Sequence, residues 1–346
     1  MEIIKKDLIN RYSNLSSYET FFKCSNEEIT KILKYQLFLR ENNSNNFSGD
    51  KSHFWDEIVS SRFIGVSDKY LMVKSGSRFS TSPFVTNHFD TRFDNNLFVK
   101  IKWLFRNLKV FYNYFNRWNT ENISLKKEIK RLKSIYGEII MPKNHDDFMN
   151  YFPIRYIDHL EIIQLIKSSD IERYLEIGPG NCINVALQLS IRKIKKVFLI
   201  DLPQSIIFGY CFLNIFFKGK FKIGLPNEVN KENIDQFDIV FLLPDQTDLI
   251  RDNNIDIAMN VSSFQEMNLE TVNNYINLLE KKLKINGQLI SVNQIKAFYI
   301  PNNNLENWKL SKFNVEKHDL GFINNRNLTL MNKNFKQILL NCILKN

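Results

Sequence analysis

From residue 173 onward, short apolar segments alternate with stretches of helical length. The apolar segments lie at 173–178, 196–202, 237–244, 255–261 and 288–294. Helical stretches such as 203–217 and 269–284 separate them. Because a helix that crosses over a sheet returns the chain to the edge where the strand began, this alternation is typical of parallel strands. The pattern predicts an α/β fold, a doubly wound Rossmann-like sheet with helices on both faces.

The chain divides into two expected domains. At 346 residues it is long enough for more than one core. Strand and helix alternation begins shortly after Tyr156, so we place the sheet domain at 151–346 and a mainly helical N-terminal region at 1–150. Alternating Leu328 and Leu330 within 325–341 indicate a last strand, which we expect to be antiparallel. The N-terminal region is expected to shape an acceptor pocket or a homo-oligomer contact.

Three features support a mainly helical N-terminal region. Residues 25–41 begin with a capping box, Ser25 and Glu28, and carry apolar residues at helical spacing. Residues 97–135 contain no Gly or Pro and predict one long helix or two shorter ones. The polar segments between them, including 75–90, are expected to be loops.

Composition excludes several classes of protein. The net charge of +10 permits a nucleic-acid or acidic partner, but the basic residues are scattered in pairs, which favours solvated helix faces and no nucleic-acid binding. The four cysteines show no CxxC spacing, and His is rare, so we expect no metal site and a reducing cytoplasmic location. No apolar run reaches about 18 residues, so no integral membrane segment is expected.

A glycine turn follows the first predicted strand, in YLEIGPGNCIN at 174–184. Gly178 and Gly180 lack the Cβ atoms that would block a ligand lying against the turn. Glu176 precedes them, where its charge would repel a pyrophosphate but could hold the α-amino group of S-adenosylmethionine. The residues therefore favour this cofactor over NAD. The alternative is that Glu176 only bonds backbone amides of the turn.

Two further segments extend the expected cofactor site. Asp201, with Leu202, ends the second strand roughly 20 residues after the glycines, the spacing expected of a carboxylate that binds a ribose diol. Asp201 could instead cap the helix that begins with Pro203. Asp245 and Gln246 follow the third strand, where a polar side chain could meet the adenine edge.

These residues resemble the class I S-adenosylmethionine-dependent methyltransferases, on the strength of LEIGPG at 175–180 and IDLP at 200–203. A longer block, IDIAMNVSSFQEMNLETVNNYI at 255–276, together with SVNQ at 291–294, resembles the sugar O-methyltransferases of bacterial surface-polysaccharide loci. The resemblance covers roughly 150–335 and implies methyl transfer to the hydroxyl of a sugar, free, nucleotide-linked or phosphorylated.

Methyl transfer to a hydroxyl needs a group that removes the hydroxyl proton. Glu266, which follows the fourth strand, is the first candidate for this base, with a helix N-terminal carboxylate as the alternative role. His159 is the second candidate, although a lone His on an apolar helix is more often structural. Ser263 and Gln265 are expected to orient the acceptor hydroxyl.

Three other side chains complete the expected site. Asn293 ends the fifth strand, and His145 lies in a predicted lid segment; both are expected to contact the acceptor. Asn260 is expected beside the cofactor, where it fixes the backbone of the loop. Two alternatives stay open: a methyltransferase acting on another small molecule or RNA, and a catalytically degenerate fold that only binds.

Overall fold

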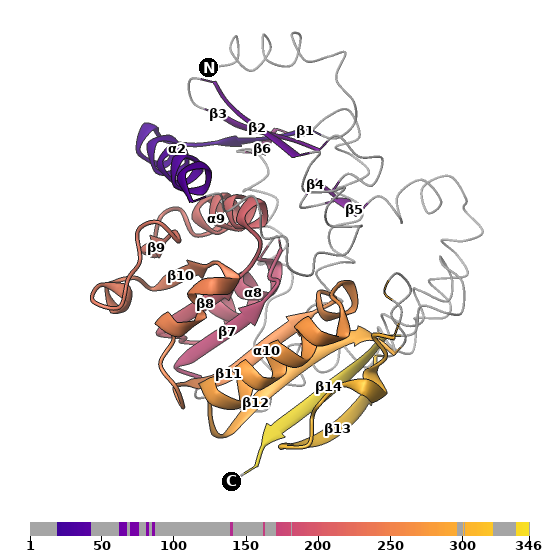
Figure 1. Cartoon of the computed structure of the whole chain (residues 1–346). Coiled ribbons are helices and arrows are strands. Elements are labelled where there is room, and N and C mark those ends of the chain that lie inside the picture. The colour runs from indigo at the N-terminus through magenta and orange to yellow at the C-terminus, as the bar shows by residue number, and fades with distance from the viewer. Residues whose placement is uncertain are drawn as a thin grey trace, which may run out of the picture.

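The chain is described from a computed structural model, in which residues 19–42, 62–67, 70–75, 81–82, 85–86, 139–140, 162, 171–180, 182–295, 300, 302–320 and 337–345 are placed. Figure 1 shows a large sheet with its helices, a smaller sheet formed by N-terminal strands, and the separate β4–β5 hairpin.

The main sheet confirms the predicted fold class. Its order is β13-β14-β12-β11-β7-β8-β10-β9, and all pairs are parallel except β12–β14 and β13–β14. Chain order reverses at β7, because β8 lies on one side of it and β11 on the other. The strands are β7 (Arg173–Ile177), β8 (Lys196–Ile200), β9 (Ile223–Gly224), β10 (Ile239–Leu242), β11 (Ile255–Val261), β12 (Leu283–Gln294), β13 (Phe313–Asp319) and β14 (Gln337–Leu344).

Helices cover both faces of this sheet (Figure 1). They are α8 (Ile183–Ile191), α9 (Pro203–Phe217) and α10 (Leu269–Lys282), with short 3-10 helices η2 (Ile234–Gln236), η3 (Pro244–Leu249), η4 (Phe264–Glu266) and η5 (Leu305–Asn307). Successive strand residues point to opposite faces. In β8, Val197 therefore packs into the core under α8 and α9, and Phe198 into the core under α10.

The antiparallel last strand is β14, which begins later than the 325–341 segment that predicted it; residues 321–336 lie outside the described part of the chain. Its partner β13 was not predicted. Most of the β13 side chains are exposed, because the strand lies at the sheet edge, so its sequence FNVEKHD carries little hydrophobic pattern.

In the N-terminal region, the predicted helix at 25–41 is confirmed as α2 (Asn26–Glu41), with the Ser25–Glu28 capping box in place. A four-stranded antiparallel sheet of order β2-β3-β1-β6 was not predicted. Its strands and a separate hairpin are β1 (Glu19–Lys23), β2 (Arg62–Ser67), β3 (Tyr70–Ser75), β6 (Ile139–Ile140), β4 (Thr81–Ser82) and β5 (Val85–Thr86). The helices expected at 97–135 lie outside the described residues and stay a prediction.

Helix α2 packs beside α9, although the predicted boundary assigns the two helices to different domains (Figure 1). Ile32 and Tyr35 are fully buried in the core that α9 shares. The Tyr35 hydroxyl donates to the Pro203 carbonyl oxygen at 3.2 Å, and Lys31 pairs with Glu228 at 2.8 Å. Helix α2 is therefore part of the hydrophobic core of the sheet domain. No helix among the described residues is long and apolar enough to cross a membrane.

Candidate functional site

The glycine turn lies at the carboxyl end of β7, where chain order reverses in the sheet. In open α/β sheets, ligands bind at this kind of switch point. The Gly178 N–H donates to the Ile200 carbonyl oxygen at 2.8 Å, which ties the turn to the end of β8. Gly178, Gly180 and Cys182 all have positive φ, so the backbone folds back sharply before α8.

The two glycines serve different purposes. A Cβ atom on Gly178 would come within 2.4 Å of the Ser263 hydroxyl oxygen, so this glycine makes room for a side chain of the protein. This corrects the expectation that Gly178 makes room for a ligand. A Cβ atom on Gly180 would meet nothing within 4 Å among the described residues. No residue of the described part of the chain therefore fills the space beside Gly180, where a ligand could lie.

Asp201 joins the turn to the start of α9. Its Oδ2 accepts the Gly180 N–H at 2.9 Å, and its Oδ1 accepts the Leu202 N–H at 2.7 Å. Leu202 is the N-cap of α9, and Pro203 is its first residue. Asp201 therefore ties the turn to the N-cap residue of α9 but does not itself cap the helix, because α9 has no side-chain cap hydrogen bond. Its predicted contact with a ribose stays a prediction. The side chain stays half-buried at the carboxyl edge.

Glu176 is buried behind the turn, and this corrects its expected contact with a cofactor. Its carboxylate accepts the Tyr174 hydroxyl at 2.6 Å and the Asn184 side-chain amide at 3.1 Å. Both donors are neutral side chains, whereas the alternative considered from the sequence was that Glu176 bonds backbone amides of the turn. Burial raises the pKa of Glu176 to about 7, against a usual value of 4.5. The residue supports the turn from below.

We expect the stability of the fold to depend on the protonation of Glu176. Because the folded-state pKa is raised, the stabilising contribution is full below pH of about 4.5 and is lost as the pH rises through about 7. The shift corresponds to about 3 kcal/mol, at about 1.4 kcal/mol per pKa unit. Glu176→Gln should abolish this loss in urea unfolding between pH 4.5 and 8, whereas the exposed Glu306→Gln should keep it. A wild-type profile parallel to that of Glu176→Gln would contradict the assignment.

The loop after β11 is held by a buried hydrogen-bond network centred on Asn260. The Asn260 side-chain amide donates to the Ile177 carbonyl oxygen at 2.9 Å and to the Ser263 hydroxyl, and its Oδ1 accepts from Asn293 at 2.8 Å. Both asparagines are at most 1% exposed. Asn260 thus fixes the loop, and neither amide is available to a ligand. This corrects the predicted acceptor contact of Asn293 and cofactor contact of Asn260.

The remaining predicted contacts on this loop are also bound to the protein. Ser263 donates to the Ile177 carbonyl oxygen at 3.1 Å. Gln265 accepts the Gln294 N–H at 2.9 Å through its side-chain oxygen. Both side chains are half-buried, and they anchor the loop to β7 and β12; their acceptor contact stays a prediction. Glu266 ends η4 at the same carboxyl edge, half-buried, on a loop that these bonds hold in one shape.

Asp245 and Gln246 lie in η3, just past β10. Gln246 bonds at both ends of its amide, to the Leu243 N–H at 3.1 Å and to the Pro226 carbonyl oxygen at 3.0 Å, so it fixes this loop; its contact with adenine stays a prediction. Asp245 is exposed. His145 and His159 lie outside the described residues and stay predictions.

Two residues near the site were missed in the sequence. Tyr35 of α2 lies close to the carboxyl edge. Burial raises the pKa of its hydroxyl, and the nearby Asp201 and Asp245 carboxylates raise it further. Asn184 of α8 is 5% exposed, and its Oδ1 has no hydrogen-bond partner among the described residues. The capping box of α2 was a signal for the helix, but nothing in the sequence indicated where it docks.

The site has room and polar groups for a nucleoside cofactor. Among the described residues, nothing lies within 4 Å of a Cβ placed on Gly180, and the Asp201 carboxylate accepts the N–H of the same residue. The described residues contain no cluster of three or more His, Cys, Asp or Glu side chains arranged to hold a metal.

Comparison with known proteins finds similar folds only. No protein-family model and no curated protein matches the chain. Geranyl diphosphate methyltransferase in complex with S-adenosylmethionine is 10% identical, over 57% of this chain and 87% of that one, with a TM-score of 0.38. YcgJ from Bacillus subtilis is 12% identical, over 54% and 99% of the two chains, with a TM-score of 0.36.

A third similar structure, the [4+2]-cyclase SpnF, is 13% identical over 56% of this chain and 81% of that one, with a TM-score of 0.37. These similar structures include both a methyltransferase and a cyclase. Fold likeness at this level does not identify a reaction. The function must therefore be argued from the residues of the site, which lie on a doubly wound sheet of mostly parallel strands.

Proposed function

We propose that the chain is an S-adenosylmethionine-dependent O-methyltransferase that acts on a sugar hydroxyl, in the biosynthesis of a surface polysaccharide. One observation carries the proposal: the turn at Gly178 and Gly180 is bonded to Asp201 at the switch point of the sheet, and none of the residues placed by the structure fills the space beside Gly180. This is the edge at which nucleoside ligands bind in doubly wound sheets.

The proposed chemistry is a displacement at carbon. The bound donor would supply a methyl group on positively charged sulfur. The Glu266 carboxylate would accept the proton of the acceptor hydroxyl as the oxygen–carbon bond forms and the sulfur–carbon bond breaks, leaving a methyl ether and S-adenosylhomocysteine. The Asn260 network supports this step, because a base acts efficiently only when its position is fixed.

The sugar acceptor is supported by the resemblance of 255–276 and 291–294 to sugar O-methyltransferases. The structure explains part of that resemblance. Asn260, Ser263 and Asn293 bond one another or the β7 backbone, and together they hold the loop that carries Glu266. In this proposal the acceptor is contacted by Ser263, Gln265 and His145 and by the N-terminal region, with Glu266 or His159 as the base.

Calorimetric titration tests the proposal. We expect S-adenosylmethionine and S-adenosylhomocysteine to bind the full chain with one-to-one stoichiometry, and NAD to give no heat of binding. A panel of nucleotide sugars should then include one that drives release of S-adenosylhomocysteine. Absence of donor binding would overturn the proposal. Donor binding without turnover on sugars would leave a methyltransferase of another small molecule or RNA, or a fold that only binds.

A further inference from the structure

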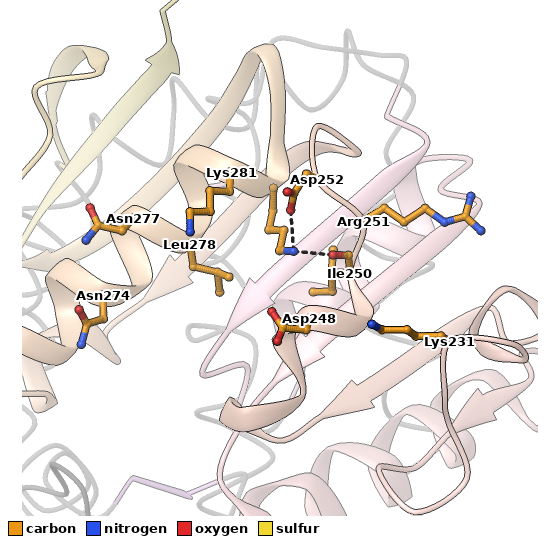
Figure 2. Close-up of a pocket in the computed structure, with 10 residues that line it drawn as sticks. Lys231, Asp248, Ile250, Arg251, Asp252, Asn274, Asn277, Leu278 and Lys281 are labelled. Atoms are coloured by element: carbon orange, nitrogen blue, oxygen red, sulfur yellow. Dashed lines mark hydrogen bonds and ion pairs between the residues drawn. The ribbon is translucent and has the colours of Figure 1, made fainter.

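A pocket of about 560 Å³ opens between η3 and α10 (Figure 2). It lies beside residues 250–254, which lead into β11, and beside the last turn of α10, which leads into β12. Both positions are at the amino ends of the parallel strands. The pocket is therefore at the edge of the sheet opposite Gly180 and Asp201, and it is separate from the proposed methyl-donor site.

The pocket has an apolar part and, next to it, an ion pair. Ile250 is buried and Leu278 is half-buried, and both line the pocket. The buried Lys282 ammonium donates to the Ile250 carbonyl oxygen at 2.6 Å and pairs with Asp252 at 2.7 Å. These bonds, drawn in Figure 2, hold the end of the pocket in place. The charge of Lys282 is fully used within the protein.

Other polar side chains of the pocket have no such partner. Five lining residues have exposed side chains that make no hydrogen bond and no ion pair with any described residue, and so are free to meet a ligand: Lys231, Asp248, Asn274, Asn277 and Lys281. Charged neighbours at the same edge are paired, as Lys284 is with Asp256 and Arg251 with Asp235. In Figure 2, Arg251 points away from the pocket, whereas Lys231 extends toward Asp248.

We propose that this pocket binds a phosphorylated sugar. The ammonium groups of Lys231 and Lys281 provide charge for a phosphate. Asp248, Asn274 and Asn277 offer acceptors and donors for hydroxyl groups. Ile250 and Leu278 provide an apolar surface for the C–H face of a sugar ring. The volume lies within the range of about 300–1,000 Å³ that is typical of small-molecule sites.

Glucose 6-phosphate serves as the probe, with inorganic phosphate and glucose as its two halves, in calorimetric titrations of the full chain at low salt. We expect saturable binding of glucose 6-phosphate, at least fivefold tighter than either half. The double variant Lys231→Gln, Lys281→Gln should weaken it at least tenfold. The control pair Lys193→Gln, Lys317→Gln makes the same charge change at exposed lysines away from the pocket and should alter affinity less than twofold.

Three outcomes would overturn the proposal. Absence of saturable binding would show that the pocket is not a site, and equal weakening by both lysine pairs would show that binding depends only on net charge. Equal affinity for phosphate and glucose 6-phosphate would show that the pocket does not recognise the sugar. The proposal is independent of the methyl donor. Asp201→Ala should leave glucose 6-phosphate affinity unchanged, so a failure of donor binding and a failure of this pocket are told apart in the same protein.

Discussion

Asp201→Ala is expected to lower the affinity for S-adenosylmethionine at least 100-fold. The substitution removes the acceptor of two backbone N–H groups, those of Gly180 and Leu202, and with it the bond between the glycine turn and α9. It also removes the carboxylate proposed to hold the ribose. Hydrogen bonds to a charged group contribute roughly 1.5–3 kcal/mol each, and a 100-fold loss corresponds to about 2.7 kcal/mol. Calorimetric titration of the donor measures the change.

Asp256→Ala is a matched control for this substitution. The Asp256 carboxylate also accepts two backbone N–H groups, those of Glu172 and Arg173, at 2.9 and 2.8 Å. It lies at the amino edge of the sheet, away from the glycine turn. Both variants should lose thermal stability, but only Asp201→Ala should lose donor affinity. Donor affinity in folded Asp201→Ala within threefold of wild type would exclude Asp201 from the site.

Glu266→Gln is expected to lower kcat between 100- and 1,000-fold and to leave donor affinity unchanged within twofold. The amide keeps the shape of the side chain but cannot accept the hydroxyl proton, and general base catalysis contributes roughly 10²–10⁴-fold. The η4 loop should keep its shape, since Asn260, Asn293 and Gln265 hold it independently of this side chain. The measurement is release of S-adenosylhomocysteine with the most active nucleotide sugar.

Glu270→Gln provides the comparison, because Glu270 is an exposed carboxylate in the first turn of α10, a few residues beyond Glu266. It should retain full turnover. Retention of more than a tenth of wild-type turnover by Glu266→Gln would reject Glu266 as the base and turn attention to His159 and His145. A flat dependence of turnover on pH in the wild type would argue against any carboxylate or histidine base.

The central strands could be predicted because their surroundings leave few choices. All residues of β8 and β10 are buried, and β7 and β11 are nearly so, so each strand is a mainly apolar segment. At the sheet edge, β13 is mostly exposed. Its partner β14 also pairs with β12, although β14 and β12 are far apart in the sequence. Edge strands are selected by pairing with a neighbour, and local sequence records that pairing weakly.

The candidate site divides in the same way. The sequence alone determined the glycine turn, the acidic residue at the end of the second strand and the edge where both emerge, because strand ends and turns are local properties of the chain. The tertiary structure decided which polar groups remain for a ligand. Asn260 and Asn293, or Gln246 and Pro226, satisfy each other across the fold, and Ser263 fills the space above Gly178. Such pairings depend on which distant residues come into contact in the fold. Only the tertiary structure therefore distinguishes the candidate site residues Gly180, Asp201 and Glu266 from the residues that hold them in place.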